Sequence, residues 1–163
     1  MNDPTIHVRM ARVEAVQLAQ LVDDFRELVG SDRDITDPAL GRLAPDPYPD
    51  DEDASKTFRS ATRDDLLDRR ALDAEIVRTA LADLRGDMDS MSQTEAFTEH
   101  ELAIGPAEVD AWLRTLTALR LVIAERLGIE SDDDHDPDDA RFGVYDWLGY
   151  RLELVIEAAD ALL

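Results

Sequence analysis

The stretch GPAEVDAWLRTLTALRLVIAERLG, residues 105–128, decides the fold that the sequence predicts. Each residue of an α-helix turns the chain by about 100°. On that basis the main apolar side chains of the stretch fall within about 40° of one line; they are Val109, Leu113, Leu116, Ile123 and Leu127. Pro106 is tolerated as a first helical residue, and Gly128 is of the type at which helices often end. The stretch therefore predicts the central helix of a helical bundle.

Apolar residues at helical spacing predict three other long helices. The first spans about residues 12–29 and ends at Gly30. The second begins after Thr62 and runs to about Leu84, and the last occupies residues 141–163. This last helix carries apolar residues on both of its sides, which fits either a central position in the bundle or a dimer interface.

Shorter elements accompany these helices. Asp37 followed by Pro38 favours a short turn of helix, and residues 54–62 favour another. Residues 6–10 alternate apolar and polar side chains, which is compatible with a short extended segment. We therefore predict an all-α protein with a single domain over residues 1–163. Its architecture is a helical bundle of about four principal helices plus one or two short ones.

Three polar segments connect the predicted helices. Residues 30–53 form a Pro/Asp-rich loop, residues 85–103 a polar connection and residues 130–139 an acidic linker. The aspartates are densest in residues 46–53 and 130–139. These two parts of the loops are therefore candidates for an acidic binding surface.

The charge of the chain favours some partners over others. It has 38 acidic residues against 17 lysines and arginines, a formal net charge of −21. Nucleic acids and anionic membranes bind Lys and Arg, so both are disfavoured unless the arginines gather on one face. Protein partners with basic surfaces fit better. Acidity that only maintains solubility is an equally good explanation.

The sequence also indicates where the protein works. It has no cysteine, which excludes disulfides, thiol sensing and thiolate metal sites. No apolar run approaches the roughly 20 residues that span a bilayer. The N-terminal stretch MNDPTIHVRM lacks the basic-then-apolar layout of a secretory signal. We expect a cytoplasmic protein that is not bound to a membrane.

No motif for catalysis is present. The sequence lacks the hydrolase, phosphate-loop, dinucleotide and zinc-protease signatures. His7, His100 and His135 have no nucleophile at a defined spacing. The aspartates around His135 lack the turn glycine and the distal glutamate of a calcium loop. We predict no catalytic, metal-binding or cofactor-binding residue, no cofactor and no enzyme activity.

Five charged residues fall on or near the apolar faces of predicted helices: Glu14, Arg70, Asp73, Arg120 and Arg151. A charge in such a place needs a partner or must reach water. Each arginine can do so separately, which is the simpler interpretation. The alternative is one partly enclosed network of arginines and carboxylates that accepts an anion. Trp112 and Trp147 are candidate core anchors.

A run of arginines extends into the second long helix: Arg59, Arg63, Arg69, Arg70 and Arg78. Aspartates are interleaved with them, so the local charge is close to neutral. Ion pairs on a solvated helix face are the simpler interpretation. A DNA-binding face is the alternative.

Five stretches occur in an order that is typical of one family: VRMARVEAVQLAQLVDDFRELVG (8–30), DPALGRLAPDPYPDD (37–51), FRSATRDDL (58–66), AWLRTLTALRLVIAERLGI (111–129) and VYDWLGYRLELVI (144–156). Together they resemble an uncharacterised, mainly actinobacterial family, the domain of unknown function numbered twenty-seventeen. The family pattern usually has Asn-Asp where this chain has Thr117 and Ala118.

The resemblance implies an all-helical cytoplasmic protein without an established catalytic site. Some relatives are described as transcription regulators that answer oxidative stress through a cysteine pair, acting with a sigma factor. This chain has no cysteine, so that way of sensing does not operate here. Genes of the family are often found near the adaptor of the Clp protease.

From these observations we predict a non-enzymatic regulatory or adaptor protein that acts through protein–protein interaction, with transcription or proteolysis machinery as the class of partner. The alternative is a DNA-associated transcription regulator that uses an arginine-bearing helix face. A third hypothesis is a small-molecule or anion binder built on the Arg/carboxylate network. Homodimerisation through the last helix is left open.

Overall fold

The computed structural model describes residues 4–45, 50–58, 62–84, 89–130, 136 and 138–162. Within these residues the elements are, in chain order, β1 (Ile6–Ala11), α1 (Arg12–Val29), α2 (Pro38–Leu43), α3 (Glu52–Phe58), α4 (Asp64–Ala80), η2 (Ala82–Leu84), α5 (Gln93–Phe97), β2 (Glu99–Ile104), α6 (Pro106–Leu127), η3 (Ala140–Phe142) and α7 (Gly143–Asp160). The two η elements are single 3₁₀ turns.

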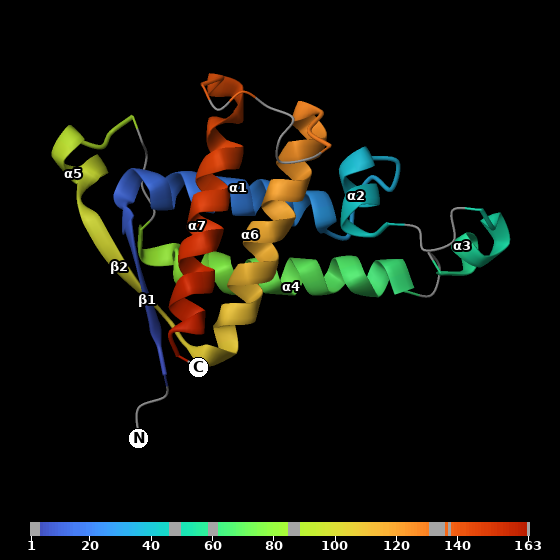
Figure 1. The fold of residues 1–163 in the computed structure, drawn as a ribbon, viewed down its shortest axis with the longest axis horizontal. Helices are drawn as coiled ribbons and strands as arrows, with labels where there is room; N and C mark the ends of the chain where they lie inside the picture. The colour runs from blue at the N-terminus through green and yellow to red at the C-terminus, as the bar shows by residue number, and fades with distance from the viewer. Residues whose placement is uncertain are drawn as a thin grey trace.

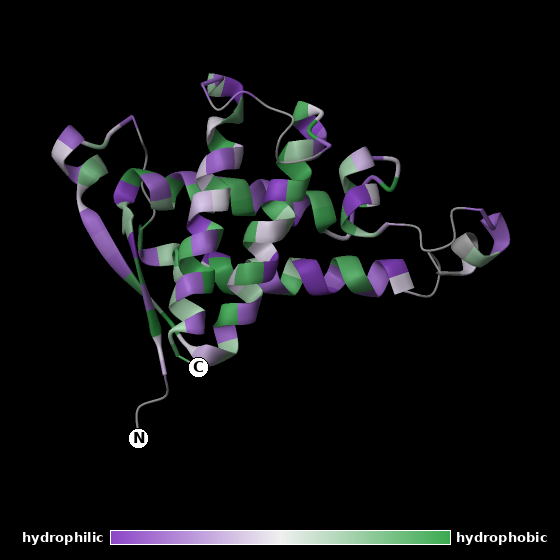
Figure 2. Cartoon of the chain, viewed as in Figure 1, coloured by the Kyte–Doolittle hydropathy of each residue, from purple (hydrophilic) through white to green (hydrophobic). Residues whose placement is uncertain are grey.

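The four long helices form two layers that cross each other (Figure 1). Helices α1 and α4 pack together in one layer, and α6 and α7 pack together in the other and run across the first. Helix α2 lies against α6, and strand β1 lies beside α7 at one end of the molecule. Apolar residues concentrate where the layers cross, whereas the first half of β2 is hydrophilic (Figure 2).

The central helix begins and ends as predicted. Gly105 precedes α6, and its backbone N–H donates to the Glu108 carboxylate over 3.3 Å. Pro106 is the first helical residue, and Gly128 ends the helix in the left-handed conformation with φ 73°. A left-handed residue at this position is the usual way to end a helix, and glycine adopts it without a steric penalty.

The buried side of α6 differs from the predicted apolar line. Among the long apolar side chains, Trp112, Leu116 and Leu119 are the most deeply buried, whereas Leu113 and Ile123 are half-buried. The reason is that α6 contacts several neighbours, namely α4, α7, α2 and α1. A helix covered on several sides does not have one buried stripe, so its sequence periodicity marks the core only approximately.

The fold is mostly helical, but it is not purely so. The extended segment expected at residues 6–10 pairs as β1 with β2 in an antiparallel two-stranded sheet, with Val8 opposite Leu102. The polar connection predicted over residues 85–103 contains α5 and most of β2, two elements that the sequence analysis did not predict. Leu102 and Ile104 are buried while the side chains between and before them are polar or small, so β2 has the alternation of a half-buried strand.

The number of long helices agrees with the prediction, and the short helices number three among the described residues. Asp37 caps α2 because its carboxylate accepts the Ala39 N–H over 2.9 Å. Most of the acidic linker, residues 131–135 and 137, lies outside the described residues, as do residues 46–49 of the first loop.

Two glycine substitutions test the ends and interiors of these helices. Gly128→Ala places a side chain at φ 73° and is expected to lower the free energy of unfolding by about 1 kcal/mol. Gly41→Ala is the matched control, because Gly41 lies within α2 and a Cβ there meets no atom within 4 Å. It is expected to raise stability by up to about 1 kcal/mol. Urea unfolding of both variants measures the difference, and an equal effect would contradict the assignment of Gly128.

Candidate functional site

A buried guanidinium joins three elements of the fold. Arg151 of α7 donates from Nε to Glu14 Oε2 of α1 over 3.0 Å, and its Nη2 pairs with the same oxygen. Its Nη1 donates to the carbonyl oxygen of Arg9 in β1 over 2.7 Å. Trp147 Nε1 adds a third donor to Glu14 Oε2 at 2.9 Å. The Arg151 side chain is only 10% exposed, so these contacts replace its hydration.

The carboxylate of this cluster is held in its charged form. Burial raises the pKa of Glu14, but the hydrogen bonds from Trp147 and Arg151 and the positive charge of Arg151 outweigh that effect. The pKa of Glu14 therefore lies below its ordinary value. An ionised Glu14 compensates the charge of Arg151, so the cluster serves to hold α1, α7 and β1 together.

The structure divides the five charged candidates among three places. Glu14 and Arg151 form the cluster just described. Asp73 of α4 instead accepts two hydrogen bonds from Arg114 of α6, at 2.9 Å from Nε and 3.2 Å from Nη2. Arg70 lines a small pocket beside that pair, and Arg120 lies in another pocket between α6 and α7.

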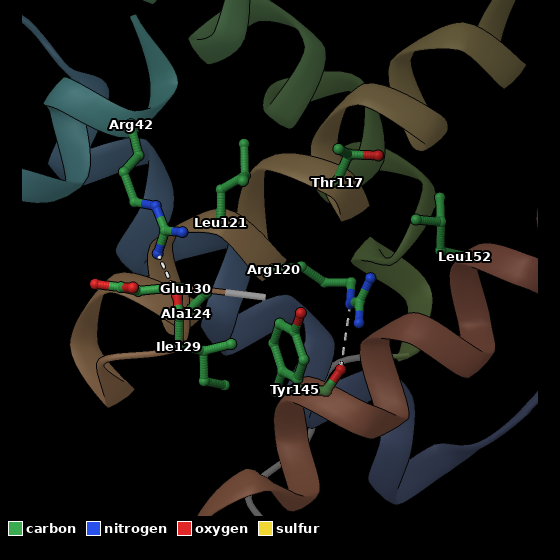
Figure 3. Close-up of a pocket in the computed structure, with 9 residues that line it drawn as sticks. All are labelled: Arg42, Thr117, Arg120, Leu121, Ala124, Ile129, Glu130, Tyr145 and Leu152. Atoms are coloured by element: carbon green, nitrogen blue, oxygen red, sulfur yellow. Dashed lines mark hydrogen bonds between the residues drawn. The ribbon is translucent and has the colours of Figure 1, made fainter. Parts of the chain in front are cut away.

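The pocket around Arg120 has a volume of about 310 Å³ (Figure 3). The Arg120 guanidinium lies 4.2 Å from the centre of the Tyr145 ring, and its Nε is 3.4 Å from the Tyr145 carbonyl oxygen. Arg42 enters from the other side and donates from Nη1 to the Ile129 carbonyl oxygen over 3.0 Å. Two cations thus line one pocket, although Glu130 lies there too.

A larger groove of about 690 Å³ separates α4 from β2. We call it the α4–β2 groove; it is lined by Leu72, Glu75, Ile76, Thr79, Ala80, Glu101, Leu102, Ala103 and Glu108. Leu72 is 62% exposed and Ile76 is 38% exposed, so two large apolar side chains of α4 face solvent. No arginine, lysine or histidine is among the described residues that line the groove. The groove is thus apolar with acidic side chains around it.

Two candidate tryptophans lie at different depths. Trp112 is 1% exposed, within the core. Trp147 is half-buried and uses its ring nitrogen to bind Glu14. Trp112 packs as an apolar side chain, whereas Trp147 is part of the polar cluster.

A family model described as "Domain of unknown function (DUF2017)" matches residues 2–159. The chain belongs to the DUF2017 family. No curated protein and no solved structure matches it.

The α4–β2 groove of this DUF2017 chain is the feature that sequence reasoning missed. It depends on β2, which was expected to be part of a polar connection. A signal was present in the sequence, because Leu72 and Ile76 fall one helical turn apart and on the opposite side of the helix from Leu67 and Ala74. Their exposure follows from the packing, since α4 turns Leu67, Ala74 and Val77 towards the core instead.

Within the described part of the DUF2017 chain, no group of three or more His, Asp or Glu side chains is placed to hold a metal ion. No helix in that part combines the length and apolarity needed to cross a bilayer. The aspartates at 132–134 and His135 lie outside the described residues.

Removing the charge of Glu14 tests the buried cluster. Glu14→Gln leaves the Arg151 guanidinium without a counter-charge, and we expect it to lower the free energy of unfolding by about 2 kcal/mol at pH 7. Glu27→Gln, at an exposed position of the same helix, is the control and should change it by less than about 0.5 kcal/mol.

The pH dependence of that loss follows from the lowered pKa of Glu14. A carboxylate with a lowered pKa stabilises the fold above the pKa of the unfolded chain, and the contribution is lost as pH falls through the folded value. The difference between the wild type and Glu14→Gln should therefore shrink below about pH 5. Urea titrations at several pH values measure it, and a difference that grows on acidification would refute the cluster's role.

Proposed function

We propose that this DUF2017 protein is a non-enzymatic regulatory or adaptor protein that acts in the cytoplasm by binding other proteins. The observation that carries the proposal is the α4–β2 groove, where Leu72 and Ile76 are exposed side by side on α4. Apolar side chains gathered in an open groove are a common feature of protein-binding surfaces. The machinery of transcription is the first class of partner to test, as the family resemblance suggests.

The charge of the groove supports a partner that is itself a protein with a basic surface. Glu75, Glu101 and Glu108 line the groove, and the whole chain carries a net charge of −21. Complementary charge speeds encounter and selects among partners, while the apolar contact supplies most of the affinity. The same charge disfavours a polyanionic partner at this groove.

A DNA-associated regulator is the second candidate, because Arg69 and Arg70 of α4 and Arg114 of α6 line one pocket. Two observations weigh against it. Arg78, further along α4, is buried and donates to Asp23 over 2.7 Å. Asp73 shares the arginine pocket and binds Arg114. Arg59 lies outside the described residues.

A binder of small anions is the third candidate. Its support is the pair Arg42 and Arg120 in the pocket of Figure 3. Both arginines have protein partners there, since Arg42 binds Ile129 and Arg120 binds Tyr145. An anion would have to share these guanidinium groups, so we rank this candidate last.

A charge placed in the groove tests the proposed function. Tagged protein is used to recover partners from a lysate of the native host, with and without nuclease, and they are identified by mass spectrometry. We expect a protein partner that survives nuclease and is recovered at least roughly tenfold less with Leu72→Glu, because the new carboxylate must be desolvated in the contact.

Ile35→Glu is the matched control, since Ile35 is 63% exposed, as Leu72 is at 62%, but lies outside the groove. It adds the same charge and should leave the recovery unchanged. Circular dichroism confirms that both variants fold. Recovery that depends on nucleic acid, or that both variants reduce equally, would contradict the proposal.

A further inference from the structure

We infer that the outer edge of β2 binds its partner by strand addition, and that the partner contributes an extended segment in which apolar and basic residues alternate. The inference rests on the proposed function and states how the α4–β2 groove is used.

The hydrogen bonding of the sheet has a fixed alternation. Arg12 N–H donates to the Thr98 carbonyl oxygen over 3.1 Å, one residue beyond the end of the ladder and in the same register. In an antiparallel pair, every second residue pair exchanges such bonds, and the pairs between them point their backbone groups outward. The Met10–His100 and Val8–Leu102 pairs are therefore hydrogen-bonded.

The Arg9–Glu101 and His7–Ala103 pairs consequently turn their N–H and C=O groups away from each other. An independent contact supports this assignment, because the Arg9 carbonyl oxygen accepts a hydrogen bond from Arg151, on the side of β1 that faces α7. On the opposite edge, Glu101 and Ala103 direct their backbone groups out of the sheet.

The two edges of the sheet therefore differ. Helix α7 lies along the β1 edge, and Arg151 binds a carbonyl oxygen there. At the β2 edge, no hydrogen bond within the described residues reaches the outward backbone groups of Glu101 and Ala103. Both residues line the α4–β2 groove, so these donors and acceptors adjoin an open space. An unpaired strand edge is a template for another strand.

The faces of β2 determine which side chains an added strand needs. Leu102 and Ile104 point to the core side, whereas Glu99, Glu101 and Ala103 point to solvent. An added strand continues both faces, because residues opposite one another in a sheet lie on the same face. Its side chains on one face meet the exposed Leu72 and Ile76, which favours apolar residues there.

Its side chains on the other face lie beside Glu101, which favours basic residues. Strand β1 already shows this arrangement from its own side, since His7 Nδ1 lies 3.0 Å from a Glu101 oxygen and Arg9 Nε lies 3.8 Å from the other. An added strand with Arg or Lys at the corresponding positions would repeat it. The segment thus alternates apolar and basic residues.

A second copy of this chain is a poor occupant of the edge. Self-pairing would place the carboxylates of Glu99 and Glu101 beside those of the other copy, and like charges on neighbouring strands are destabilising. Each copy also brings a net charge of −21. Charge complementarity therefore favours a basic segment of a different protein.

The probe for this inference is the heptapeptide RVRVRVR, acetylated and amidated at its ends, and titrated against the full-length protein by calorimetry. The control peptide RRRRVVV has the same composition and charge without the alternation. We expect RVRVRVR to bind at least tenfold more tightly than the control. Equal affinities would show that charge alone drives binding and would overturn the inference.

N-methylation of the peptide tests the backbone contact while leaving the protein unchanged. In an antiparallel added strand, the residues opposite Glu101 and Ala103 are the arginines, and their N–H groups face β2. Methylating the arginine amides should then weaken binding at least tenfold, and methylating the valine amides should not. In a parallel strand the effects are reversed. If both methylated peptides bind as the parent does, strand addition is wrong.

Ala103→Pro is the corresponding change in the protein, because it removes an outward N–H without removing a bond to β1. It should weaken binding of RVRVRVR at least tenfold, whereas Ala103→Ser, which keeps the N–H, should not. Amide hydrogen exchange of the wild-type protein, with and without the peptide, gives a second measurement. We expect the Glu101 and Ala103 amides to exchange more slowly when the peptide is bound. Unchanged exchange at both amides would overturn the inference even if Ala103→Pro fails to fold.

The outcomes separate this inference from the proposed function. If Leu72→Glu abolishes recovery of the native partner while both methylated peptides bind like the parent, the groove binds protein but not by strand addition. If Leu72→Glu leaves recovery unchanged, the proposed function fails, whatever the peptides do. Sedimentation of the wild type and of Ala103→Pro tests whether a second copy of the chain occupies the edge. A wild-type dimer that Ala103→Pro dissociates would assign the edge to that second copy and overturn the inference.

Discussion

The buried ion pair between Arg151 and Glu14 is the interaction on which the arrangement of the layers depends. Arg151 reaches from α7 to α1 and to the backbone of β1, so one side chain fixes the position of three elements. A buried guanidinium is costly unless its donors are satisfied, and here the cost is offset by Glu14 and the Arg9 carbonyl oxygen. The hydrogen bonds of the pair form only when α7 lies at one position on the sheet. They therefore favour that position over others that would bury a similar apolar area.

This placement makes the sheet asymmetric. Helix α7 lies along β1, and the outward carbonyl of Arg9 is bonded within the fold. Strand β2 is covered on its core face, but its outer edge adjoins the α4–β2 groove. The contact with Arg151 thus occupies the β1 edge, and the β2 edge is the one that the proposed strand addition would use.

The long helices and the extended segment of β1 were predictable from the sequence, whereas β2 and its pairing with β1 were not. Residues 12–29 and 106–127 carry periodic apolar residues with Gly30 or Gly128 at their ends, and these local signals determine helices. Strand β2 depends on a partner that lies about ninety residues away, so its short alternation at 99–104 becomes decisive only once β1 is adjacent. Likewise, Glu14 and Arg151 stood out as charges on apolar faces, but their contact is a property of the packed helices.

The same limit applies to reading function from charge. A DNA-binding arginine face was the alternative to ion pairing in the sequence analysis, and several arginines are indeed bound to carboxylates of other segments: Arg33 to Asp64 and Asp68, Arg78 to Asp23, Arg114 to Asp73 and Arg126 to Asp37. These pairs join one segment to another, so they serve the fold. In each pair the arginine neutralises a carboxylate. The net charge of −21 therefore resides on the remaining carboxylates. Some of these, including Glu75, lie beside exposed apolar side chains in the α4–β2 groove, and under the proposed function this combination would select for a partner with basic and apolar residues.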